Sequence, residues 1–257
     1  MKLPPEAPAI PAHLLRGASV LADRNAILPL LPKHRVFAEV GVAAGDFSRL
    51  VMSVCEPSLF VAIDEFRLHE LPMLWGQAPE KLLGAMTHSQ AYRSRFEDAI
   101  ASGRMRMLEG DSAACLEQLD DASVDVIYVD ADHRYEFVRR DLAAARRKVR
   151  HDGWIIVNDY LMVAELGASL PYGVVNATNE FMLQHDWGMQ YLALQTRMFC
   201  DVVLRPSRLL RDPAAKNDAL RHEVALLRAS TSWRVTRPLR AAGRLLAGRV
   251  RPRPKVV

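Results

Sequence analysis

The sequence predicts an α/β fold: a Rossmann-like, doubly wound, mainly parallel sheet that ends in a C-terminal antiparallel hairpin. Three observations favour this class. Short apolar runs alternate with segments of helical spacing along most of the chain. Acidic, amide or glycine residues follow these runs, as they do at the carboxyl edge of a parallel sheet. Half of the 257 residues are hydrophobic, which is enough for one sizeable core.

The apolar runs predict five strands, at Val36–Val40, Leu59–Ile63, Arg104–Leu108, Val124–Val129 and Trp154–Val157. Helical spacing occurs at 13–31, from Asp46 onward, at 78–86, at 88–101, at Tyr135–Arg150 and at Val174–His185. Met189–Gln195 and Met198–Leu204 predict a closing hairpin around a turn at Thr196-Arg197. The alternation indicates right-handed crossovers with helices on both faces of the sheet, and the hairpin as its antiparallel edge.

Composition divides the chain into an irregular segment at 1–17, the α/β domain at 18–205 and a basic C-terminal extension at 206–257. From Arg205 onward, twelve Arg and two Lys face three acids, so this part carries +11 and the preceding residues carry −7. The first residues lack the apolar stretch of a signal peptide. No apolar run approaches the ~20 residues that span a bilayer. The three cysteines form no CxxC pair, so we expect reduced thiols in a cytoplasmic protein.

The basic extension allows three interpretations. The first is a solvated, partly helical tail or an arm for homo-oligomerisation. The second is peripheral attachment to the inner face of the cytoplasmic membrane, because basic residues bind anionic headgroups. The segment Ser232–Arg240 resembles tails of bacterial glycosyltransferases that assemble surface polysaccharides, which supports this second interpretation. Nucleic-acid binding ranks last, because the tail has no interleaved aromatic residues beyond Trp233.

The first candidate site element is Glu39-x-Gly41-x-x-x-Gly45, between the first strand and its helix. The glycines allow a sharp turn close to a ligand. The spacing differs from the GxGxxG of dinucleotide-binding proteins, which disfavours a nicotinamide-dependent enzyme. A carboxylate before the first glycine repels pyrophosphate but suits the ammonium group of an amino-acid cofactor. This loop therefore favours S-adenosylmethionine.

Two further strand ends fit the same cofactor. Asp64 ends the second strand about 20 residues after the glycine turn, with Phe66 beside it, where an acid accepts the ribose hydroxyls. Asp111 and Ser112 follow the third strand, where they are placed to contact the adenine ring. The competing interpretations are a solvated loop acid for Asp64 and a helix N-cap for Asp111.

The fourth element combines Asp130-Ala131-Asp132-His133 with Asn158-Asp159 after the next strand. Adjacent parallel strands lie about 5 Å apart, so Asp130 and Asp159 are expected to face one cavity. Two close carboxylates repel each other unless they share a proton or a cation, and Mg²⁺ prefers oxygen ligands such as these and Asn158. His133 is a candidate general base for a hydroxyl nucleophile. The alternatives are a surface histidine and an N-cap pair.

Phe37–Gly45, Val61–Phe66, Asp125–Asp141 and Gly153–Tyr160 resemble the macrocin O-methyltransferase-like family, over roughly residues 18–204. The resemblance implies a class I S-adenosylmethionine-dependent methyltransferase that methylates a sugar hydroxyl in glycoside or polysaccharide biosynthesis. It also implies that Asp130 and Asp159 bind a divalent metal, that His133 is the base, and that Glu39 and Asp64 hold the cofactor. Asn158 departs from the pattern, because relatives often carry an acid there.

The acceptor is open at this stage. A sugar or glycan is the first expectation, a catechol-like small molecule uses the same metal chemistry, and a non-catalytic scaffold with this fold is a third possibility. Residues 66–103 are expected to cover the acceptor, with Trp75, His88, Tyr92 and Arg93 as candidate contacts.

Overall fold

The computed structural model describes residues 6–161, 172–195 and 200–211. The strands are β1 (Ser19–Leu21), β2 (Val36–Val40), β3 (Leu59–Asp64), β4 (Met105–Glu109), β5 (Val124–Val129), β6 (Val149–Val157), β7 (Trp187–Leu194) and β8 (Cys200–Pro206). The α-helices are α1 (Asp46–Val54), α2 (Glu80–Leu83), α3 (His88–Arg95), α4 (Glu97–Ala101), α5 (Ser112–Glu117), α6 (Tyr135–Lys148), α7 (Val174–His185) and α8 (Ser207–Arg211). Short 3₁₀ turns are η1 (Ala12–Leu14), η2 (Arg24–Ala26), η3 (Leu28–Leu30) and η4 (Leu68–Glu70).

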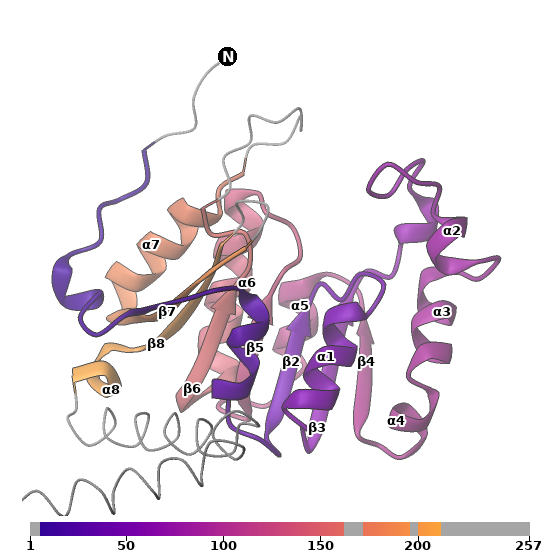
Figure 1. Ribbon diagram of the computed structural model, residues 1–257, viewed down its shortest axis with the longest axis horizontal. Coiled ribbons are helices and arrows are strands. Elements are labelled where there is room, and N and C mark those ends of the chain that lie inside the picture. Colours follow the sequence, from indigo (N-terminus) through magenta and orange to yellow (C-terminus); the bar gives the residue numbers. More distant parts are fainter. Residues whose placement is uncertain (1–5, 162–171, 196–199, 212–257) are drawn as a thin grey trace, which may run out of the picture. The chain divides into compact units, whose positions relative to one another are not determined.

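These strands form one sheet in the order β1-β7-β8-β6-β5-β2-β3-β4 (Figure 1). β8 is antiparallel to β6 and β7, and the other neighbouring pairs are parallel. The chain passes from β2 outward through β3 to β4 and then returns to β5 on the other side of β2. This return creates a switch point between β2 and β5, where doubly wound sheets bind ligands. The predicted fold class is confirmed.

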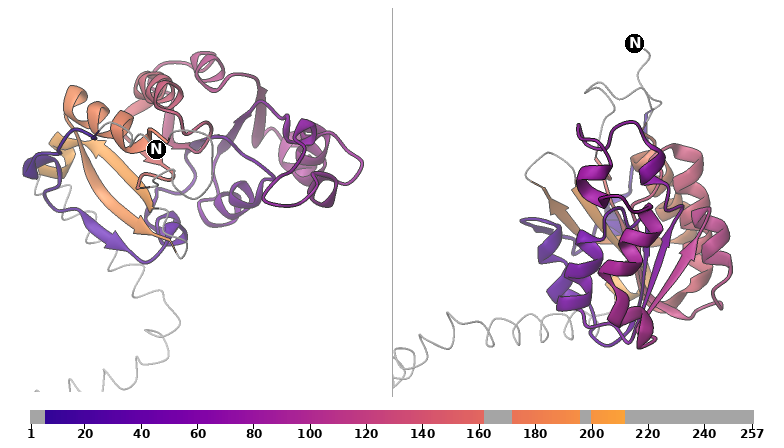
Figure 2. Two further views of the ribbon diagram at one scale, coloured as in Figure 1. Left: turned by 90° about the horizontal axis from the view of Figure 1, so that it is seen from above. Right: turned by 90° about the vertical axis from the view of Figure 1, so that its right-hand side faces the viewer.

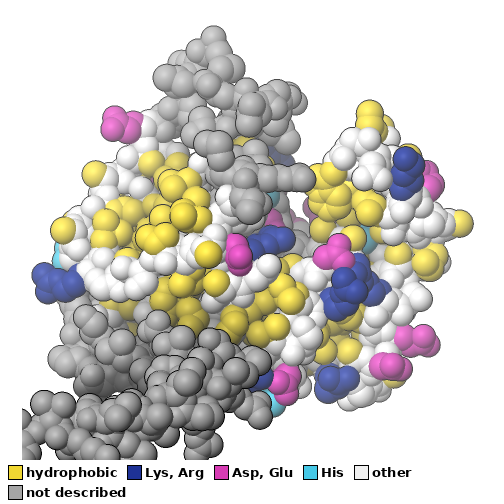
Figure 3. Space-filling model, viewed as in Figure 1, with side chains coloured by type: hydrophobic (Ala, Val, Ile, Leu, Met, Phe, Trp, Pro, Cys, Tyr) yellow, Lys and Arg dark blue, Asp and Glu magenta, His cyan; other side chains and the backbone are white. Residues whose placement is uncertain are grey.

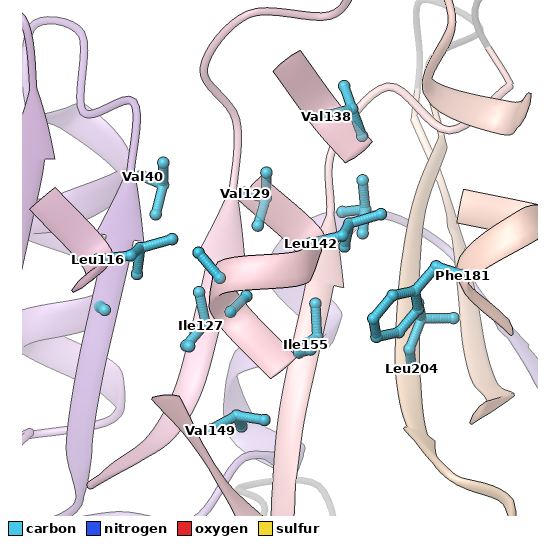
Figure 4. Close-up of a cluster of buried hydrophobic side chains, with 14 of the residues drawn as sticks. Val40, Leu116, Ile127, Val129, Val138, Leu142, Val149, Ile155, Phe181 and Leu204 are labelled. Atoms are coloured by element: carbon cyan, nitrogen blue, oxygen red, sulfur yellow. The ribbon is translucent and has the colours of Figure 1, made fainter. Parts of the chain in front are cut away.

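Side chains alternate between the two faces of the sheet, and each face carries its own core. Ile127 and Ile155 pack with α5, α6 and α7, as the labelled side chains of Figure 4 show. Phe37 and Val126 point to the opposite face, which is covered by α1, α3 and η3. Figure 2 shows helices on both sides of the sheet. Both cores are apolar and buried, so they hold the strand ends in fixed positions.

The prediction of a helix at 13–31 is wrong. Gly17 has φ +83°, Pro29 stands near the start of η3, and the segment forms 3₁₀ turns around β1. β1 pairs with β7 in parallel, from Ser19 opposite Tyr191 to Leu21 opposite Ala193. The outer strand on this side is therefore β1, and the predicted hairpin β7–β8 lies inside the sheet. The pairing partner is about 170 residues away in sequence, so local spacing could not reveal it.

The other predicted elements differ mainly at their ends. β6 begins at Val149, earlier than predicted, because α6 already ends at Lys148. The helical stretch predicted at 88–101 divides into α3 and α4 at Phe96. The turn at Thr196-Arg197 lies outside the described residues.

The basic extension also lies outside the described residues after Arg211, so the interpretations of its role stay predictions. By its contacts the chain separates into a unit at Met1–Asp212 and a second at Pro213–Val257. Within the described ranges, no helix has the length and apolar character needed to cross a membrane. Cys55, Cys115 and Cys200 are buried free thiols.

Close packing explains why a glycine, Gly41, directly follows β2. It has φ +85°, and a Cβ atom built on it would lie 2.0 Å from the carbonyl oxygen of Asp130. The backbone N–H of Asp130 donates to Val40 O at 2.7 Å, and that of Gly41 donates to Ile63 O at 2.8 Å. The ends of β2, β3 and β5 thus meet at a point that has no room for a side chain.

We predict that Gly41→Ala lowers the free energy of unfolding in urea by about 3 kcal/mol or more. Left-handed backbone alone costs an alanine about 1–2 kcal/mol, and the overlap with Asp130 adds to it. Gly17→Ala is the matched control, because Gly17 has φ +83° but open space around its Cβ position. Equal losses in the two variants would contradict the packing argument.

Candidate active site

The carboxyl ends of β5 and β6 bring three side chains together. His133 Nε2 lies 3.5 Å from Asp130 Oδ1 and 3.5 Å from Asp159 Oδ2. The three side chains are partly buried, with exposed fractions of 26%, 22% and 15% for Asp130, His133 and Asp159. Asp159 has φ +53°, a left-handed conformation that Asp tolerates better than most residues. The predicted grouping of these residues is therefore present.

The surroundings of His133 favour its charged form. Burial lowers the pKa of its imidazole, but Asp130, Asp159 and Asn158 outweigh burial, so the pKa is raised overall. Nε2 is buried and has no partner within normal hydrogen-bond geometry. On its other side the ring stacks on Tyr172, with centroids 4.9 Å apart and planes 25° from parallel. His133 is thus an oriented imidazole that faces two carboxylates.

Asp159 is the second perturbed group in this cluster. Burial, together with repulsion from Asp130, raises the pKa of its carboxyl to about 6, although His133 and Arg24 lower it. His133 and Asp159 therefore both have raised pKa values within one cluster. Groups of this kind are common in sites that transfer protons.

The predicted metal set of Asp130, Asn158 and Asp159 does not fit this arrangement. Asn158 Nδ2 donates to Tyr128 Oη at 3.2 Å and to Asp201 Oδ1 at 2.9 Å, because strand alternation turns its side chain to the Tyr128 face. The His133 ring approaches both carboxylates from between them. Across residues 6–161, 172–195 and 200–211 no three His, Cys, Asp or Glu side chains are grouped to hold a metal ion.

Asn158 instead belongs to a buried polar cluster that sequence reasoning did not find. Tyr128 Oη donates to Asp201 Oδ2 at 2.8 Å and accepts from Arg24 Nη1 at 3.3 Å. Gln195 Nε2 donates to Asp201 Oδ1 at 2.6 Å. Arg24 also lies 3.9 Å from Asp130. The cluster therefore joins the N-terminal segment, β5, β6 and β8 directly behind the His133 site.

Asp201 holds this cluster together. It is fully buried, and burial raises the pKa of its carboxyl to about 7 despite the hydrogen bond from Tyr128. An acid inside the apolar stretch of β8 was a visible sign in the sequence, since a buried carboxyl needs partners. Arg24 carried no such sign, because its segment looked helical.

Glu39, which was predicted to bind the ammonium group of the cofactor, is buried inside the protein. Strand alternation puts it on the α1 face, where it is 2% exposed and accepts from Ser48 Oγ at 2.6 Å. Tyr92 Oη donates to the same Ser48 oxygen at 2.8 Å. Burial raises the pKa of Glu39 well above its usual range, although the Ser48 bond lowers it. Glu39 thus anchors α1 below the glycine loop.

Asp64 lies at the predicted strand end and holds the glycine loop. Its Oδ2 accepts from the backbone N–H of Val42 at 2.9 Å and of Ala43 at 3.3 Å, and its Oδ1 accepts from that of Phe66 at 2.8 Å. Its side chain is 16% exposed. Each carboxylate oxygen has two lone pairs, so Oδ1 retains capacity for a ligand hydroxyl.

Helix α3 packs against the glycine loop. His88 Nε2 lies 2.5 Å from Ala43 O, and Arg95 pairs with Ala44 O and Asp46. A Cβ on Gly45 would lie 2.7 Å from the Phe96 ring. Gly41 and Gly45 are therefore required by close packing inside the protein, in addition to any ligand.

This packing corrects several predictions for residues 66–103. His88 and Tyr92 are buried, at 0% and 1%, so they support the glycine loop and do not contact an acceptor. Phe66 is 1% exposed and packs on both rings, so it does not line an open cofactor site. Trp75, in contrast, is 68% exposed. Other hydrophobic side chains gather around α2 on the face that Figure 3 shows.

Asp111 is the N-cap of α5, and Ser112 is the first residue of that helix. Asp111 Oδ1 accepts from the backbone N–H of Ala114 at 3.0 Å and from Arg140 at 2.8 Å. Ser112 Oγ donates to Asp141 Oδ1 at 2.5 Å. Burial raises the pKa of Asp141 to about 6. Both predicted adenine contacts thus start α5 and tie it to α6.

The residues of this site lie in a part of the chain that matches a known protein family. A protein-family model described as a methyltransferase domain matches residues 38–160, a little under half of the chain. The match includes the glycine loop, Asp64, Asp130, His133 and Asp159. Comparison with curated proteins finds no match.

Solved structures with this fold include the O-methyltransferase TomG from Streptomyces achromogenes, which is involved in tomaymycin synthesis and was solved with S-adenosylmethionine. It has a TM-score of 0.50 and 15% identity, over 71% of this chain and 79% of TomG. The pyocyanin biosynthetic protein PhzM has a TM-score of 0.47 and 14% identity, over 70% of this chain and 53% of PhzM. The chain therefore spans about half of PhzM. Precorrin-6y C5,15-methyltransferase from Geobacter metallireducens has a TM-score of 0.47 and 11% identity, over 70% of this chain and 85% of that protein.

At these identities the likeness to solved structures concerns the fold alone. The family model matches residues 38–160 as a methyltransferase domain, and the fold of the chain is shared with the O-methyltransferase TomG.

Proposed function

We propose that this methyltransferase transfers the methyl group of S-adenosylmethionine to a sugar hydroxyl, with His133 as the general base. One observation carries the proposal: the His133 imidazole is oriented by Asp130 and Asp159, 3.5 Å from each, at the switch point of the sheet. An imidazole with a raised pKa and fixed orientation is suited to remove a hydroxyl proton.

The charges around the glycine loop support S-adenosylmethionine as the cofactor. Asp130 and Asp64 both raise the pKa of Glu39 by repulsion, after burial, and Arg24 offsets them only in part. A cofactor with a sulfonium and an ammonium group is attracted by such a site, whereas pyrophosphate is repelled. Asp64 is the residue to accept the ribose hydroxyls, through the capacity left on Oδ1. TomG, which has this fold, was solved with S-adenosylmethionine bound.

The bound cofactor would supply an activated methyl group for in-line transfer. The side chains of this protein orient the acceptor oxygen and remove its proton. Because Nε2 faces the two carboxylates, Nδ1 is the ring nitrogen left to accept the proton from the hydroxyl. Asp130 and Asp159 then stabilise the imidazolium, as a carboxylate does in the Ser-His-Asp triad. Alignment of the acceptor supplies much of the remaining rate enhancement.

The sugar as acceptor, in glycoside or surface-polysaccharide biosynthesis, rests on the resemblance of the sequence to sugar O-methyltransferases. A catechol-like hydroxyl would use the same base and is the second candidate. A scaffold without activity is disfavoured, because Asp130, His133 and Asp159 lie together and Asp64 holds the glycine loop.

Magnesium is not needed in this proposal. A cation bound by Asp130 and Asp159 would have to displace the His133 imidazole, whose Nε2 lies 3.5 Å from both carboxylates. The base itself relieves the repulsion between the two carboxylates when it is protonated.

We predict that S-adenosylhomocysteine raises the Tm by several degrees at a hundred-fold excess over its Kd. Such binding stabilises the native state by about 2.7 kcal/mol. His133→Ala should keep this shift but lower turnover by about 10²–10⁴-fold. His151→Ala, an exposed histidine on β6, is the control with unchanged turnover. An unshifted Tm at saturating ligand would remove the proposed cofactor, and an active His133 variant would remove the base.

The acid limb of kcat/KM against pH should report His133. Its pKa is raised above 6.5, so activity appears as pH rises through that higher value and the imidazole becomes neutral. Asp159→Asn removes a charge that raises this pKa, and Asn tolerates the left-handed backbone. The limb should therefore move to lower pH. Asp120→Asn, an exposed acid before β5, serves as the control. A limb that does not move in Asp159→Asn contradicts the assignment.

Metal removal tests the role of magnesium directly. After dialysis against EDTA, we expect methyl transfer in metal-free buffer at the original rate, measured as S-adenosylhomocysteine released. Loss of activity that Mg²⁺ restores would reinstate the cation at Asp130 and Asp159.

A further inference from the structure

A groove runs between α6 and α7 on the side of the sheet opposite α1. It consists of two adjoining hollows, of about 550 Å³ and about 330 Å³, that share Tyr135, Glu136 and Glu180. The larger hollow also reaches Phe137, Tyr172 and the N-terminal residues Glu6 and Pro8. Pockets for organic ligands commonly measure about 300–1,000 Å³.

One side chain, Tyr172, contacts both the larger hollow and the proposed base. Tyr172, which lines it, stacks on the His133 ring. The backbone N–H of Gly173 donates to His133 O at 2.9 Å. A Cβ on Gly173 would lie 2.5 Å from Tyr135, so the first turns of α6 and α7 are in close contact here. A ligand in this hollow therefore contacts the tyrosine that stacks on the His133 imidazole.

The N-terminal segment forms a fixed wall of the groove. Asn179 Nδ2 donates to Pro8 O at 2.7 Å, and Asn179 Oδ1 accepts from Tyr160 Oη at 2.6 Å. This chain of bonds connects residues just after β6 with the start of the domain. The wall is therefore built before a ligand binds, which lowers the entropic cost of binding.

The chemistry of the lining favours a polyhydroxyl ligand with apolar ring faces. Tyr135, Phe137 and Tyr172 offer aromatic surfaces, and Glu180 accepts from Tyr135 Oη at 2.5 Å across the groove. Carboxylates accept hydrogen bonds from several hydroxyl groups.

The cations that line the described groove are engaged by acids. Arg134 forms a bidentate pair with Asp132, and Arg139 pairs with Glu136. Glu6 and Glu180 add negative charge. A phosphate or other polyanion is thus repelled, whereas neutral sugars are not.

We propose that this groove is the acceptor site, and that it binds a neutral glycoside longer than one sugar ring. The ring to be methylated adjoins His133 and Tyr172, and the rest of the glycoside follows α6 and α7 past Tyr135 and Glu180. This inference rests on the proposed function, and it moves the acceptor away from residues 66–103.

Saturation-transfer NMR on the full chain with S-adenosylhomocysteine tests this site. The probes are p-nitrophenyl mono- and disaccharides of glucose and rhamnose, with 4-nitrocatechol as the non-sugar probe. We expect a disaccharide to bind more tightly than its monosaccharide. Phe137→Ala and the milder Glu180→Gln should each raise its Kd at least ten-fold. Trp75→Ala, an exposed aromatic residue before α2, is the matched control with unchanged Kd.

The outcomes separate the two claims. A Tm shift with S-adenosylhomocysteine in each variant shows that the variant is folded and that the cofactor site is intact. Glycoside binding that is unaffected in both groove variants, or that is lost in Trp75→Ala, overturns the groove. Binding of 4-nitrocatechol alone, or of no probe, overturns the glycoside as its ligand. Failure of S-adenosylhomocysteine to bind the unaltered protein rejects the proposed function instead.

Discussion

The close approach of Gly41 to the backbone of Asp130 is the contact on which the site depends. It brings the end of β2 against the end of β5, where the return of the chain opens the sheet. A side chain at position 41 would separate the glycine loop from Asp130 and His133. Because the cores on both faces fix the strands, this separation would spread to Asp64 at the end of β3 and to Asp159, which follows β6 beside β5.

Alternation along the strands decides which polar side chains reach this meeting point. Glu39, Tyr128 and Asp201 fall on the α1 face and become buried partners of Ser48, Asn158 and Arg24. Asp130 and Asp159 lie just beyond the last paired residues, so their side chains face His133. The division follows from the period of two in a strand, which assigns neighbouring residues to opposite faces.

The two polar groups near the strand ends differ in burial and in hydrogen bonding, which gives them different roles. In the Arg24–Tyr128–Asp201 cluster, Tyr128 and Asp201 are fully buried and well hydrogen-bonded, so the cluster fixes the arrangement of β5, β6 and β8. The Asp130–His133–Asp159 group is partly exposed and lacks ideal hydrogen bonds. A satisfied network is rigid, whereas an incompletely satisfied one retains capacity to exchange protons. We therefore propose catalysis for the second group and a supporting role for the first.

The sequence by itself determined the fold class, the five central strands and the positions of Asp64, Asp130, His133 and Asp159 at strand ends. Periodicity and glycine spacing are local properties, so they can be read from the chain. Only the tertiary structure decided which side chains face each other. Arg24 meets Tyr128 across 104 residues, β1 pairs with β7, and Asn158 turns to Asp201. These contacts depend on the order of the strands in the sheet and on the face that each side chain occupies. Neither can be read from neighbouring residues in the sequence.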